Sequence, residues 1–519
     1  MLRSRRLWIP LFLAAIGWAQ FRETGDASLS AQLELVSTPR VPLRVYLFKD
    51  GRPFRLNPVD AMLPLRVDLF YRERPWRKSA DPSVLEVTCA DQSHFFLLKG
   101  EAGFSLPAGN YTVEAYRGLF YRPFRAEFRL EAGKTQRVEL KMEDWSRGDS
   151  GQWLSADDHI HLVRAPEDDA LFLNWMDAED LSVGNFLQLQ RQMDAATQYG
   201  FGPKAEAKRT ARSIRSGHES RSQFFGHVNL LGGREMIRPL SLGVEYSNGP
   251  GTFPYPHVLF GMGRKVGALT GFAHFDGSQK HSSLPMDLAL GGLDFIEVFQ
   301  FGRLKTEEWY TLLNAGFRVT GIAGSDFPVS LSNFTREAKW SRWLPLLGPE
   351  RMLVRRRPQA SAYESWAGGV KQGEGLVTNG PLVELAVTAN KVSARGRFYR
   401  DLETLEIVAN GTVIAMRQRG NDMTVDADLP SVRPLWIAAR ASAGADPNGG
   451  VVIQAHTNPQ YFGWTGAAVD AAARASIAER WEKEVAYYRG AALVFPTEKE
   501  RSQFFDECDR ALRILRGRE

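Results

Sequence analysis

Histidines are concentrated in one part of this 519-residue chain, where seven of the nine lie between positions 159 and 281. The segment DHIH at 158–161 places His159 and His161 at i and i+2. On a strand this spacing puts both imidazoles on one face, where they can hold one cation. Neutral imidazole suits zinc, iron or manganese, so the pattern indicates a metal site. Asp158 is then either a partner that orients a histidine ring or a solvated turn residue.

A carboxylate lies among the next histidines. Glu219 directly follows His218, and His227 comes eight residues later at the start of an apolar segment. A carboxylate has two oxygens and can bridge two cations, so a glutamate near histidine ligands points to more than one metal. His218 competes with Glu219 as the ligand, and a charge in a surface loop is the other interpretation of Glu219.

Two more polar residues follow apolar segments that we predict to be strands. His274 comes after residues 266–273, and Asp326 comes after residues 317–323. Parallel α/β barrels gather their active-site groups at the carboxyl ends of their strands. We therefore expect both residues in the same site, although each taken alone could be an ordinary loop or turn residue.

The elements that must position these residues change in character along the chain. Period-two alternation between about 30 and 145 predicts an antiparallel β-sandwich, and alternation returns from Leu382, where Asn410-Gly411 indicates a hairpin. Between them, short apolar segments separated by amphipathic or glycine-rich stretches are typical of an α/β fold with a largely parallel sheet. Thr497 and Glu500 form a capping box that opens a C-terminal helix. The predicted α/β strands are 224–231, 266–273, 293–300 and 317–323.

The ordered motifs resemble a known superfamily. The segments ADDHIHL, HESRSQFFGHVNLLG, GFAHF, DFIEVFQ and GIAGSDF, in this order, are similar to the PHP (polymerase and histidinol phosphatase) superfamily, and in particular to its exported CehA/McbA-type metallohydrolases. The flanking segments LPAGNYTVEAYRG, VTNGPLVEL, VANG and AHTNP look like the β-domains of that group. The resemblance implies a distorted (β/α)7-type barrel between two antiparallel β-sandwich domains. The expected divisions are a signal peptide at 1–19, an N-terminal β-sandwich at 20–150, the PHP-like domain at 151–381, a C-terminal β-domain at 382–460 and a helical segment at 461–519.

The resemblance also implies a ligand set, with one or two divalent ions (zinc, manganese or iron) as cofactors. Glu297 matches a family position near the site but could be a structural strand residue. Two departures reduce the expected metal count: the final motif continues to Phe327 instead of a histidine, and an Asp-His pair is replaced by LSVGNFLQL around Asn185. The residues expected to bind metal are His159, His161, Glu219, His227, His274 and Asp326.

The function that follows is hydrolysis by a metal-activated water, with Asp326 and Asp158 as candidate catalytic residues and Asp326 as a proton acceptor. The family points to ester or carbamate bonds. The alternatives are a PHP-type phosphoesterase and a non-catalytic exported protein that binds a glycan or protein on a degenerate barrel. A phosphoesterase needs cations for its anionic substrate, and the candidates are Arg234, Arg264, Lys280 and Arg303, each of which is otherwise, and by preference, interpreted as a solvated surface charge.

Composition narrows the partners. Lys plus Arg (65) exceeds Asp plus Glu (60) by five, and three of the basic residues precede position 7, so no concentrated basic footprint for nucleic acid remains. Residues 1–19 combine a basic start with a short apolar run, which predicts a signal peptide and export to the periplasm or medium. No later segment is apolar enough to span a membrane. Two cysteines build no disulfide framework, so any metal must be held by histidines and carboxylates. The expected partner is a small-molecule substrate.

Overall fold

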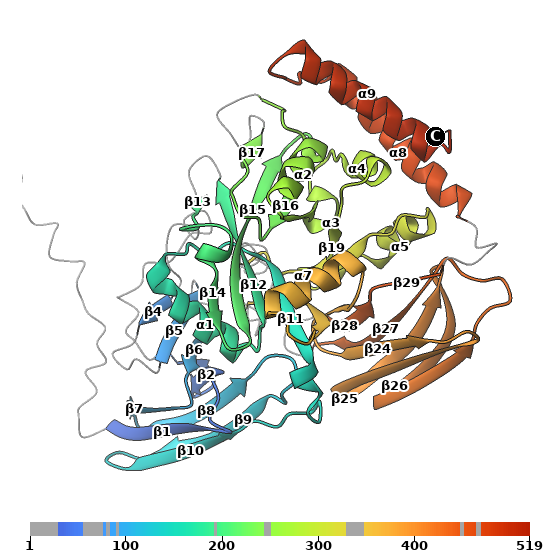
Figure 1. Cartoon of the computed structure of the whole chain (residues 1–519). Coiled ribbons are helices and arrows are strands. Elements are labelled where there is room, and N and C mark those ends of the chain that lie inside the picture. Colours follow the sequence, from blue (N-terminus) through green and yellow to red (C-terminus); the bar gives the residue numbers. More distant parts are fainter. Residues whose placement is uncertain are drawn as a thin grey trace, which may run out of the picture.

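The computed structural model describes residues 30–54, 76–78, 84–89, 93–190, 195–242, 251–327, 347–446, 451–462 and 469–518. The predicted signal peptide lies outside these residues. Figure 1 shows β-sheets at the start of the chain, mixed strands and helices in the middle, a second β-rich part and two long C-terminal helices. The chain is therefore α/β overall, as the sequence predicted, while the assignment to a barrel and two sandwich domains stays a prediction.

The N-terminal part forms two sheets that share an apolar core. Alternation positions that core: in the first strand Leu33 and Leu35 are buried while Gln32 and Glu34 are exposed. One sheet has the order β10-β1-β7, and the other has the order β4-β5-β6-β2-β8-β9, with β3 beside β2. The strands are β1 (Ser30–Thr38), β2 (Leu43–Lys49), β3 (Arg52–Pro53), β4 (Trp76–Lys78), β5 (Val84–Cys89), β6 (Ser93–Leu98), β7 (Glu101–Pro107), β8 (Gly109–Tyr116), β9 (Phe124–Leu130) and β10 (Thr135–Lys141).

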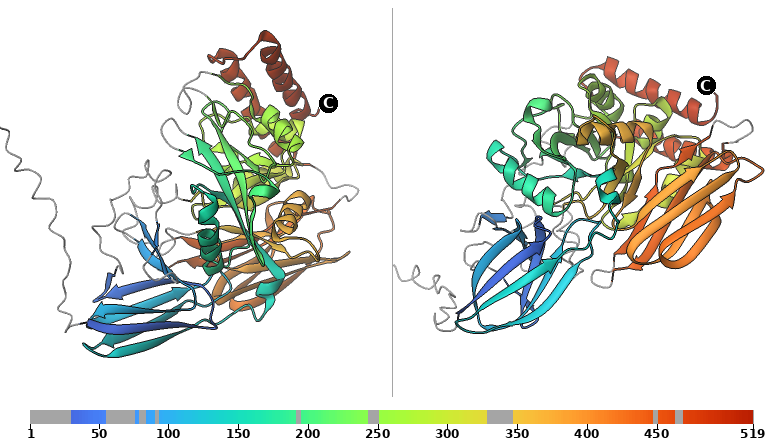
Figure 2. Two further views of the ribbon diagram at one scale, coloured as in Figure 1. Left: turned by 60° about the vertical axis from the view of Figure 1, so that its left-hand side comes forward. Right: turned by 60° about the horizontal axis from the view of Figure 1, so that its bottom comes forward.

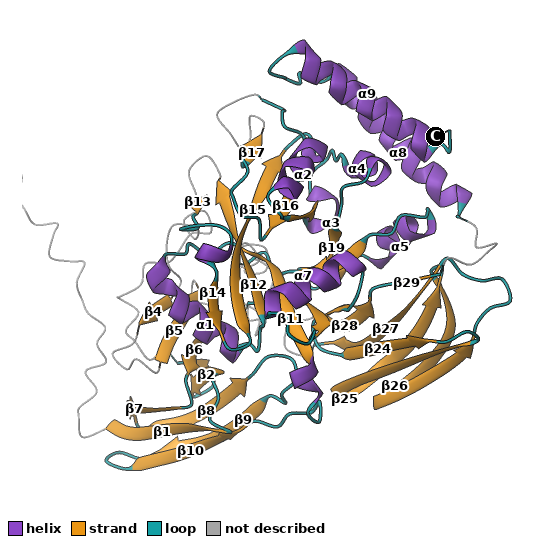
Figure 3. Cartoon of the chain, viewed as in Figure 1, coloured by secondary structure: helices purple, strands orange, loops and turns teal. Residues whose placement is uncertain are grey.

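The middle part carries the strands that position the candidate site (Figure 3). The pairs β11–β12, β12–β15, β18–β19 and β19–β21 are parallel, and β16 is antiparallel to β15 and β18. A parallel bridge between Ile160 and Phe327 joins the end of β11 to the residues after β21. The strands are β11 (Trp153–Ile160), β12 (Val183–Gln190), β13 (Ala195–Ala196), β14 (Ala207–Arg209), β15 (Arg212–Ser222), β16 (Val228–Leu231), β17 (Ser241–Leu242), β18 (Leu269–Phe272), β19 (Phe295–Gln300), β20 (Arg303–Leu304), β21 (Thr320–Ala323), β22 (Arg351–Arg355) and β23 (Leu376–Thr378).

The four predicted strands of this part are present as β16, β18, β19 and β21, but each begins later than predicted. The residues before them belong to loops or helix ends; Val266, for example, caps α2. The helices are α1 (Asp169–Ala178), α2 (Pro256–Lys265), α3 (His274–Gly277), α4 (Leu284–Leu290), α5 (Thr306–Asn314) and α7 (Ala362–Gln372). Leu154, Val183 and Trp366 share one apolar cluster, so α7 packs its buried face on β11 and β12.

The second β-rich part continues the same hydrogen-bonded sheet. Strand β23 pairs with both β22 and β28, so the predicted boundary at 381/382 falls within continuous strand pairing. The Asn410-Gly411 hairpin is confirmed, because Ala409 pairs with Thr412 across that turn. Both turn residues have positive φ, of 48° and 85°, as this two-residue turn requires. The strands are β24 (Leu382–Val387), β25 (Lys391–Ala409), β26 (Thr412–Asp428), β27 (Trp436–Ala445), β28 (Val452–Thr457) and β29 (Gln460–Tyr461).

Two C-terminal helices, α8 (Ala471–Gly490) and α9 (Glu498–Leu515), complete the described chain. Thr497 caps α9 as predicted, with its hydroxyl accepting from the Lys499 N–H. Both views in Figure 2 place this pair at the end of the molecule opposite the N-terminal sheets. Trp481 and Phe504 of the pair share an apolar cluster with Phe225 and Tyr255 of the middle part. Within the described residues, no helix has the length and hydropathy that a membrane span requires.

Candidate metal centre

The six side chains predicted as ligands meet in one buried cluster. Each is at most 8% exposed. Three overlapping groups within the set have their ligand atoms within 4.8 Å of one another. The structure thus brings the predicted residues together from five separate segments, while their role as ligands stays a prediction. We call this set the metal cluster: His159, His161, Glu219, His227, His274 and Asp326.

One half of the metal cluster has the spacing of ligands around a single ion. His159 Nε2 lies 3.0 Å from His161 Nε2 and 3.5 Å from Asp326 Oδ1. His161 Nε2 lies 3.1 Å from Glu219 Oε2 and 3.5 Å from Asp326 Oδ1. Metal–ligand bonds of about 2.0–2.1 Å at tetrahedral angles separate ligand atoms by about 3.3 Å. These four atoms therefore fit a divalent cation, and Asp326 Oδ1 is buried without a hydrogen-bond partner among the described residues.

Glu219 connects this half to a second pair of histidines. Its Oε1 lies 3.0 Å from His227 Nδ1 and 3.5 Å from His274 Nε2, whereas its Oε2 faces His159 and His161. The two oxygens of one carboxylate thus face two imidazole pairs. This is the arrangement that a carboxylate bridging two cations requires.

Neighbouring groups fix how the rings are protonated. His161 Nδ1 lies 3.2 Å from the Leu187 carbonyl, and His159 Nδ1 lies 3.2 Å from Glu297 Oε1. Both partners are acceptors, so each Nδ1 donates to its partner and each Nε2 points into the cluster, where its lone pair can bind a metal when the ring is neutral. Glu297 also accepts a hydrogen bond of 2.6 Å from the His274 N–H.

The charge balance of the cluster favours a cation. Burial alone opposes a charge on His159, but Asp326 and Glu297 raise the pKa of this imidazole well above its ordinary value. Burial also opposes the charge on Glu219, yet Arg221 and His227 hold the pKa of that carboxyl well below its ordinary value. Glu219 therefore stays ionised and attracts positive charge to the space between the histidines.

The local backbone explains how strand ends present these residues. His274 and Asp326 lie just past β18 and β21 and have positive φ values of 53° and 49°. Such a conformation is uncommon outside glycine and costs energy, and it occurs preferentially at functional sites. Gly277 lets two loops touch, since a Cβ there would lie 2.5 Å from the backbone nitrogen of His227. This contact brings the His227 and His274 loops together.

The C-terminal helices hold the same loops from outside. Tyr488 of α8 donates a hydrogen bond of 2.8 Å to the Phe224 carbonyl, three residues before His227. Arg480, also of α8, lies 3.2 Å from Asp276, two residues after His274. The helical segment therefore supports the second half of the metal cluster.

Asp158 does not have the predicted orienting role. It belongs to none of the three ligand groups, and neither of its buried oxygens has a hydrogen-bond partner among the described residues. Burial, followed by the charges of Glu297 and Asp157, raises its pKa well above the ordinary value. Glu297, which the sequence left undecided, contacts His159 instead. The turn interpretation of Asp158 is also wrong, because the residue lies within β11.

The competition between His218 and Glu219 is decided by the strand that carries both. The loop interpretation of Glu219 is wrong, since β15 spans Arg212–Ser222 and alternation turns the two neighbours to opposite faces. His218 packs at 6.3 Å from the ring of Phe201, and burial lowers its pKa to about 3. The sequence missed β15 because its residues are mostly polar.

The two departures from the family pattern have structural roles. Phe327, in place of the expected histidine, is buried and packs against Trp175 at 5.6 Å. Asn185 is buried and donates to the Asp157 carbonyl at 3.2 Å. Neither residue belongs to the metal cluster, so these two expected ligands are absent.

Several residues near the cluster were not identified from the sequence. Arg221 donates to Glu219 Oε2 at 2.8 Å, and Gln300 Oε1 lies 2.5 Å from His274 Nδ1. Gln279 Nε2 lies 3.0 Å from His227 Nε2. The signal for Gln300 was its position three residues after Glu297. In a regular strand this spacing puts two side chains on opposite faces, and a register shift in β19 brings both toward the site.

The four basic residues considered as partners of a substrate phosphate are all exposed, and none of them takes part in the contacts within the metal cluster. Arg234 and Arg264 donate to the backbone carbonyls of Lys265 and Gly292. None of the contacts to the metal cluster reported above involves the side chain of Lys280 or Arg303. Their exposure agrees with the interpretation of all four as surface charges.

Comparisons with known proteins give remote structural similarities. The sequence matches no protein-family model, and a comparison with curated proteins gives no match. A two-domain protein from Bacteroides vulgatus, described as containing a predicted PHP-like metal-dependent phosphoesterase, is 11% identical with a TM-score of 0.31 over 59% of this chain and 95% of that one. PsfC from Pseudomonas syringae is 15% identical (TM-score 0.29; 41% and 87% covered), and Endonuclease Q in complex with a duplex is 12% identical (TM-score 0.28; 42% and 57% covered).

Proposed function

We propose that this protein is a metal-dependent hydrolase of the PHP type that cleaves ester or carbamate bonds. The observation that carries the proposal is the position of Glu219 between two pairs of buried imidazoles. Four imidazoles and two carboxylates form a donor set for divalent transition metals, which bind imidazole in its neutral form. Burying these groups together without a cation would be costly, because their lone pairs and negative charges converge.

Within this proposal the residues have separate tasks. His159, His161, Glu219 and Asp326 hold one ion, and Glu219, His227 and His274 hold a second. When bound, a divalent cation lowers the pKa of water to near 7 and polarises the bond to be cleaved. Asp326 would hold the ion through Oδ1 and accept a proton from water in the site through its other oxygen, Oδ2. Glu297 positions the His159 ring and the His274 backbone.

The substrate class follows from the charges near the cluster. A phosphoester carries negative charge that the site must neutralise. Arg234, Arg264, Lys280 and Arg303 are exposed, and Arg221 is engaged by Glu219. Lys305 donates to the His274 carbonyl at 2.9 Å, which occupies part of its charge. Among the described residues, this distribution supports the neutral substrates, esters and carbamates, over phosphoesters.

The proposal includes the architecture that the resemblance implied. The strand order from β11 to β21 and the bridge between Ile160 and Phe327 support a closed (β/α)7-type barrel. The two N-terminal sheets and the strands β24–β29 would then be the flanking β-domains of a CehA/McbA-type enzyme. Export of the protein, based on residues 1–19, is part of the same proposal.

The test combines metal analysis with activity. Purified wild-type protein and His159→Ala are compared on an aryl ester, an aryl carbamate and a bis-aryl phosphate, with metal content measured alongside. We expect one or two bound ions and ester or carbamate turnover for the wild type, and loss of both for His159→Ala. His257→Ala is the matched control, because His257 is half-buried and lies outside the metal cluster. A wild-type protein that binds no metal and turns over none of the substrates would favour the non-catalytic binding protein. Preferred turnover of the bis-aryl phosphate would favour a phosphoesterase.

A further inference from the structure

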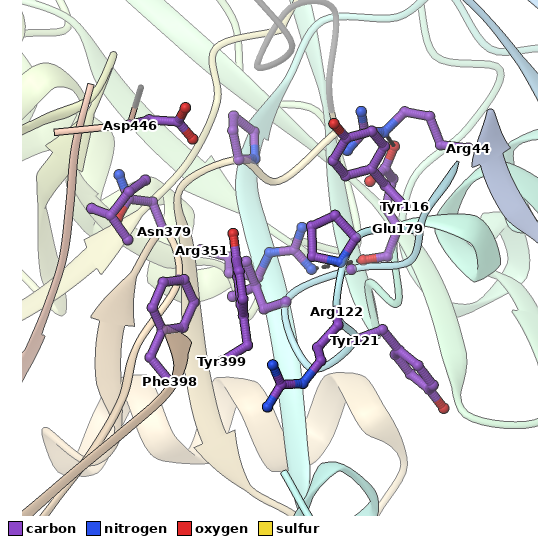
Figure 4. A pocket seen from close by; sticks show the side chains of 16 residues that line it. Arg44, Tyr116, Tyr121, Arg122, Glu179, Arg351, Asn379, Phe398, Tyr399 and Asp446 are labelled. Atoms are coloured by element: carbon purple, nitrogen blue, oxygen red, sulfur yellow. Dashed lines mark hydrogen bonds and ion pairs between the residues drawn. The ribbon is translucent and has the colours of Figure 1, made fainter. Parts of the chain in front are cut away.

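A cavity separate from the metal cluster lies where the N-terminal sheets, the middle part and the C-terminal strands meet (Figure 4). It encloses about 370 Å³, within the usual range of about 300–1,000 Å³ for small-molecule sites. Tyr116 and Tyr121 line it from the N-terminal part, Arg351 from β22, and Phe398 and Tyr399 from β25. The metal-cluster residues are not among its lining residues.

Two buried arginines lie in the wall of this cavity, and only one of them has an ion pair with a carboxylate of the described residues. Arg44 forms an ion pair of 2.8 Å with Glu179. Arg351 is 3% exposed, and its hydrogen bonds go to two backbone carbonyls, those of Gly348 at 2.5 Å and Glu179 at 2.8 Å. No carboxylate of the described residues lies within 4.0 Å of its guanidinium nitrogens.

A buried guanidinium without an anionic partner is costly. Burial accordingly lowers the pKa of Arg351. Of the three lining arginines, Arg44 pairs with Glu179 at 2.8 Å and Arg122 pairs with Glu143 at 3.2 Å, so Arg351 is the one without an ion pair to a carboxylate of the described residues. One negative charge on a ligand would supply that partner.

Aromatic rings provide the remaining walls. Phe398 and Tyr399 lie side by side, with ring centroids 4.3 Å apart, and Figure 4 shows them on the side of the cavity opposite Tyr121. Aromatic faces favour stacking with flat or ring-shaped ligands. The cavity therefore combines one uncompensated cation with surfaces for a ring.

We propose that this cavity binds a small monocarboxylate that carries a ring, with the carboxylate on Arg351 and the ring against Phe398 and Tyr399. The planar guanidinium matches the geometry of a carboxylate. A phosphate monoester would bring close to two negative charges against the one lining arginine that has no ion pair with a described carboxylate, so it fits less well. Aromatic acids and sugar acids both offer a flat or apolar face beside one carboxylate, and the titrations below distinguish these two sources of the ring.

Calorimetric titration of the full chain tests this proposal. Phenylacetate represents the aromatic acids and glucuronate the sugar acids, while phenylacetamide and phenyl phosphate are the neutral and more highly charged comparisons. We expect one of the two carboxylates to bind at least about tenfold more tightly than either comparison. Comparable binding of phenylacetamide, tighter binding of phenyl phosphate, or no binding of either carboxylate at about 10 mM would overturn the proposal.

Two variants locate the binding. Arg351→Gln removes the cation and should weaken carboxylate binding by about ten- to a hundredfold. Tyr399→Ala removes a partly exposed ring, leaves the Arg351 contacts in place and should also weaken binding. Arg356→Gln, an exposed arginine just past β22, is the control and should bind like the wild type. Unchanged affinity in both Arg351→Gln and Tyr399→Ala would contradict the proposal. Binding is measured after treatment with a chelator, so the outcome is independent of the proposed hydrolase activity.

Discussion

Two regions of this protein bury histidines, and they satisfy the rings differently. His456 in β28 is fully buried, with Nε2 accepting from the Tyr310 hydroxyl at 2.6 Å and Nδ1 donating to the Thr457 carbonyl at 2.7 Å. In the metal cluster, His159 Nε2 and His161 Nε2 face each other at 3.0 Å. A buried ring with a partner at each nitrogen is complete within the protein. Two rings whose Nε2 atoms converge are stabilised by a cation between them, so the arrangement around each ring, and not burial alone, separates structure from function.

The largest expected effect is on the bridging carboxylate. Glu219→Gln removes the negative charge between the two imidazole pairs, so we expect loss of bound metal and a fall in kcat/KM of at least about a thousandfold. Metal analysis and ester or carbamate turnover measure both. Glu206→Gln changes a buried carboxyl outside the cluster and should keep its metal. Stoichiometric metal in Glu219→Gln would contradict the bridging assignment.

The next effect concerns His456, whose two ring nitrogens both have hydrogen-bond partners. His456→Ala leaves the Tyr310 hydroxyl and the Thr457 carbonyl without their partner and opens a cavity, so the free energy of unfolding should fall by about 2–4 kcal/mol. Metal content should not change. In chelator-treated protein, His161→Ala should cost less, because it also removes one of two converging lone pairs. Urea unfolding of both variants tests the contrast, which fails if His161→Ala is the more destabilising.

A smaller effect is expected for the residue that orients the rings. Glu297→Gln keeps the size of the side chain but weakens its hydrogen bonds to His159 and His274, so metal affinity should fall by about ten- to a hundredfold. Activity should return at high metal concentration. Glu308→Gln on the exposed face of α5 is the control. Wild-type affinity in Glu297→Gln would show that this carboxylate has no part in ordering the ligands.

The smallest effect is a pH dependence of stability at His456. Burial lowers the pKa of His456 to about 4. Since the unfolded chain binds this proton first, the contribution is complete above about pH 6.5 and is lost as the pH falls toward 4. At pH 5.5 the loss is about 1.4 kcal/mol. The difference between wild type and His456→Gln isolates this residue, and parallel pH profiles of the two proteins would contradict it.

Part of the candidate site could be predicted from the sequence because two of its residues follow a strand signal. His274 and Asp326 come directly after apolar segments, and the carboxyl ends of neighbouring parallel strands meet at one edge. Glu297 and Gln300 could not be assigned in this way, since a register shift in β19 changes which residues share a face. The polar composition of β15 hid the strand that carries Glu219.

The sequence by itself determined which residue types were available for metal, the alternation of the β-rich parts and the turn at Asn410-Gly411, because these depend on local periodicity and backbone preference. The tertiary structure alone decided which oxygen of Glu219 faces which histidines, and that Glu297, not Asp158, touches His159. It also decided that Arg351 is buried with no carboxylate of the described residues within 4.0 Å of its guanidinium nitrogens. Those features depend on distances between segments far apart in the chain, and local patterns do not encode such distances.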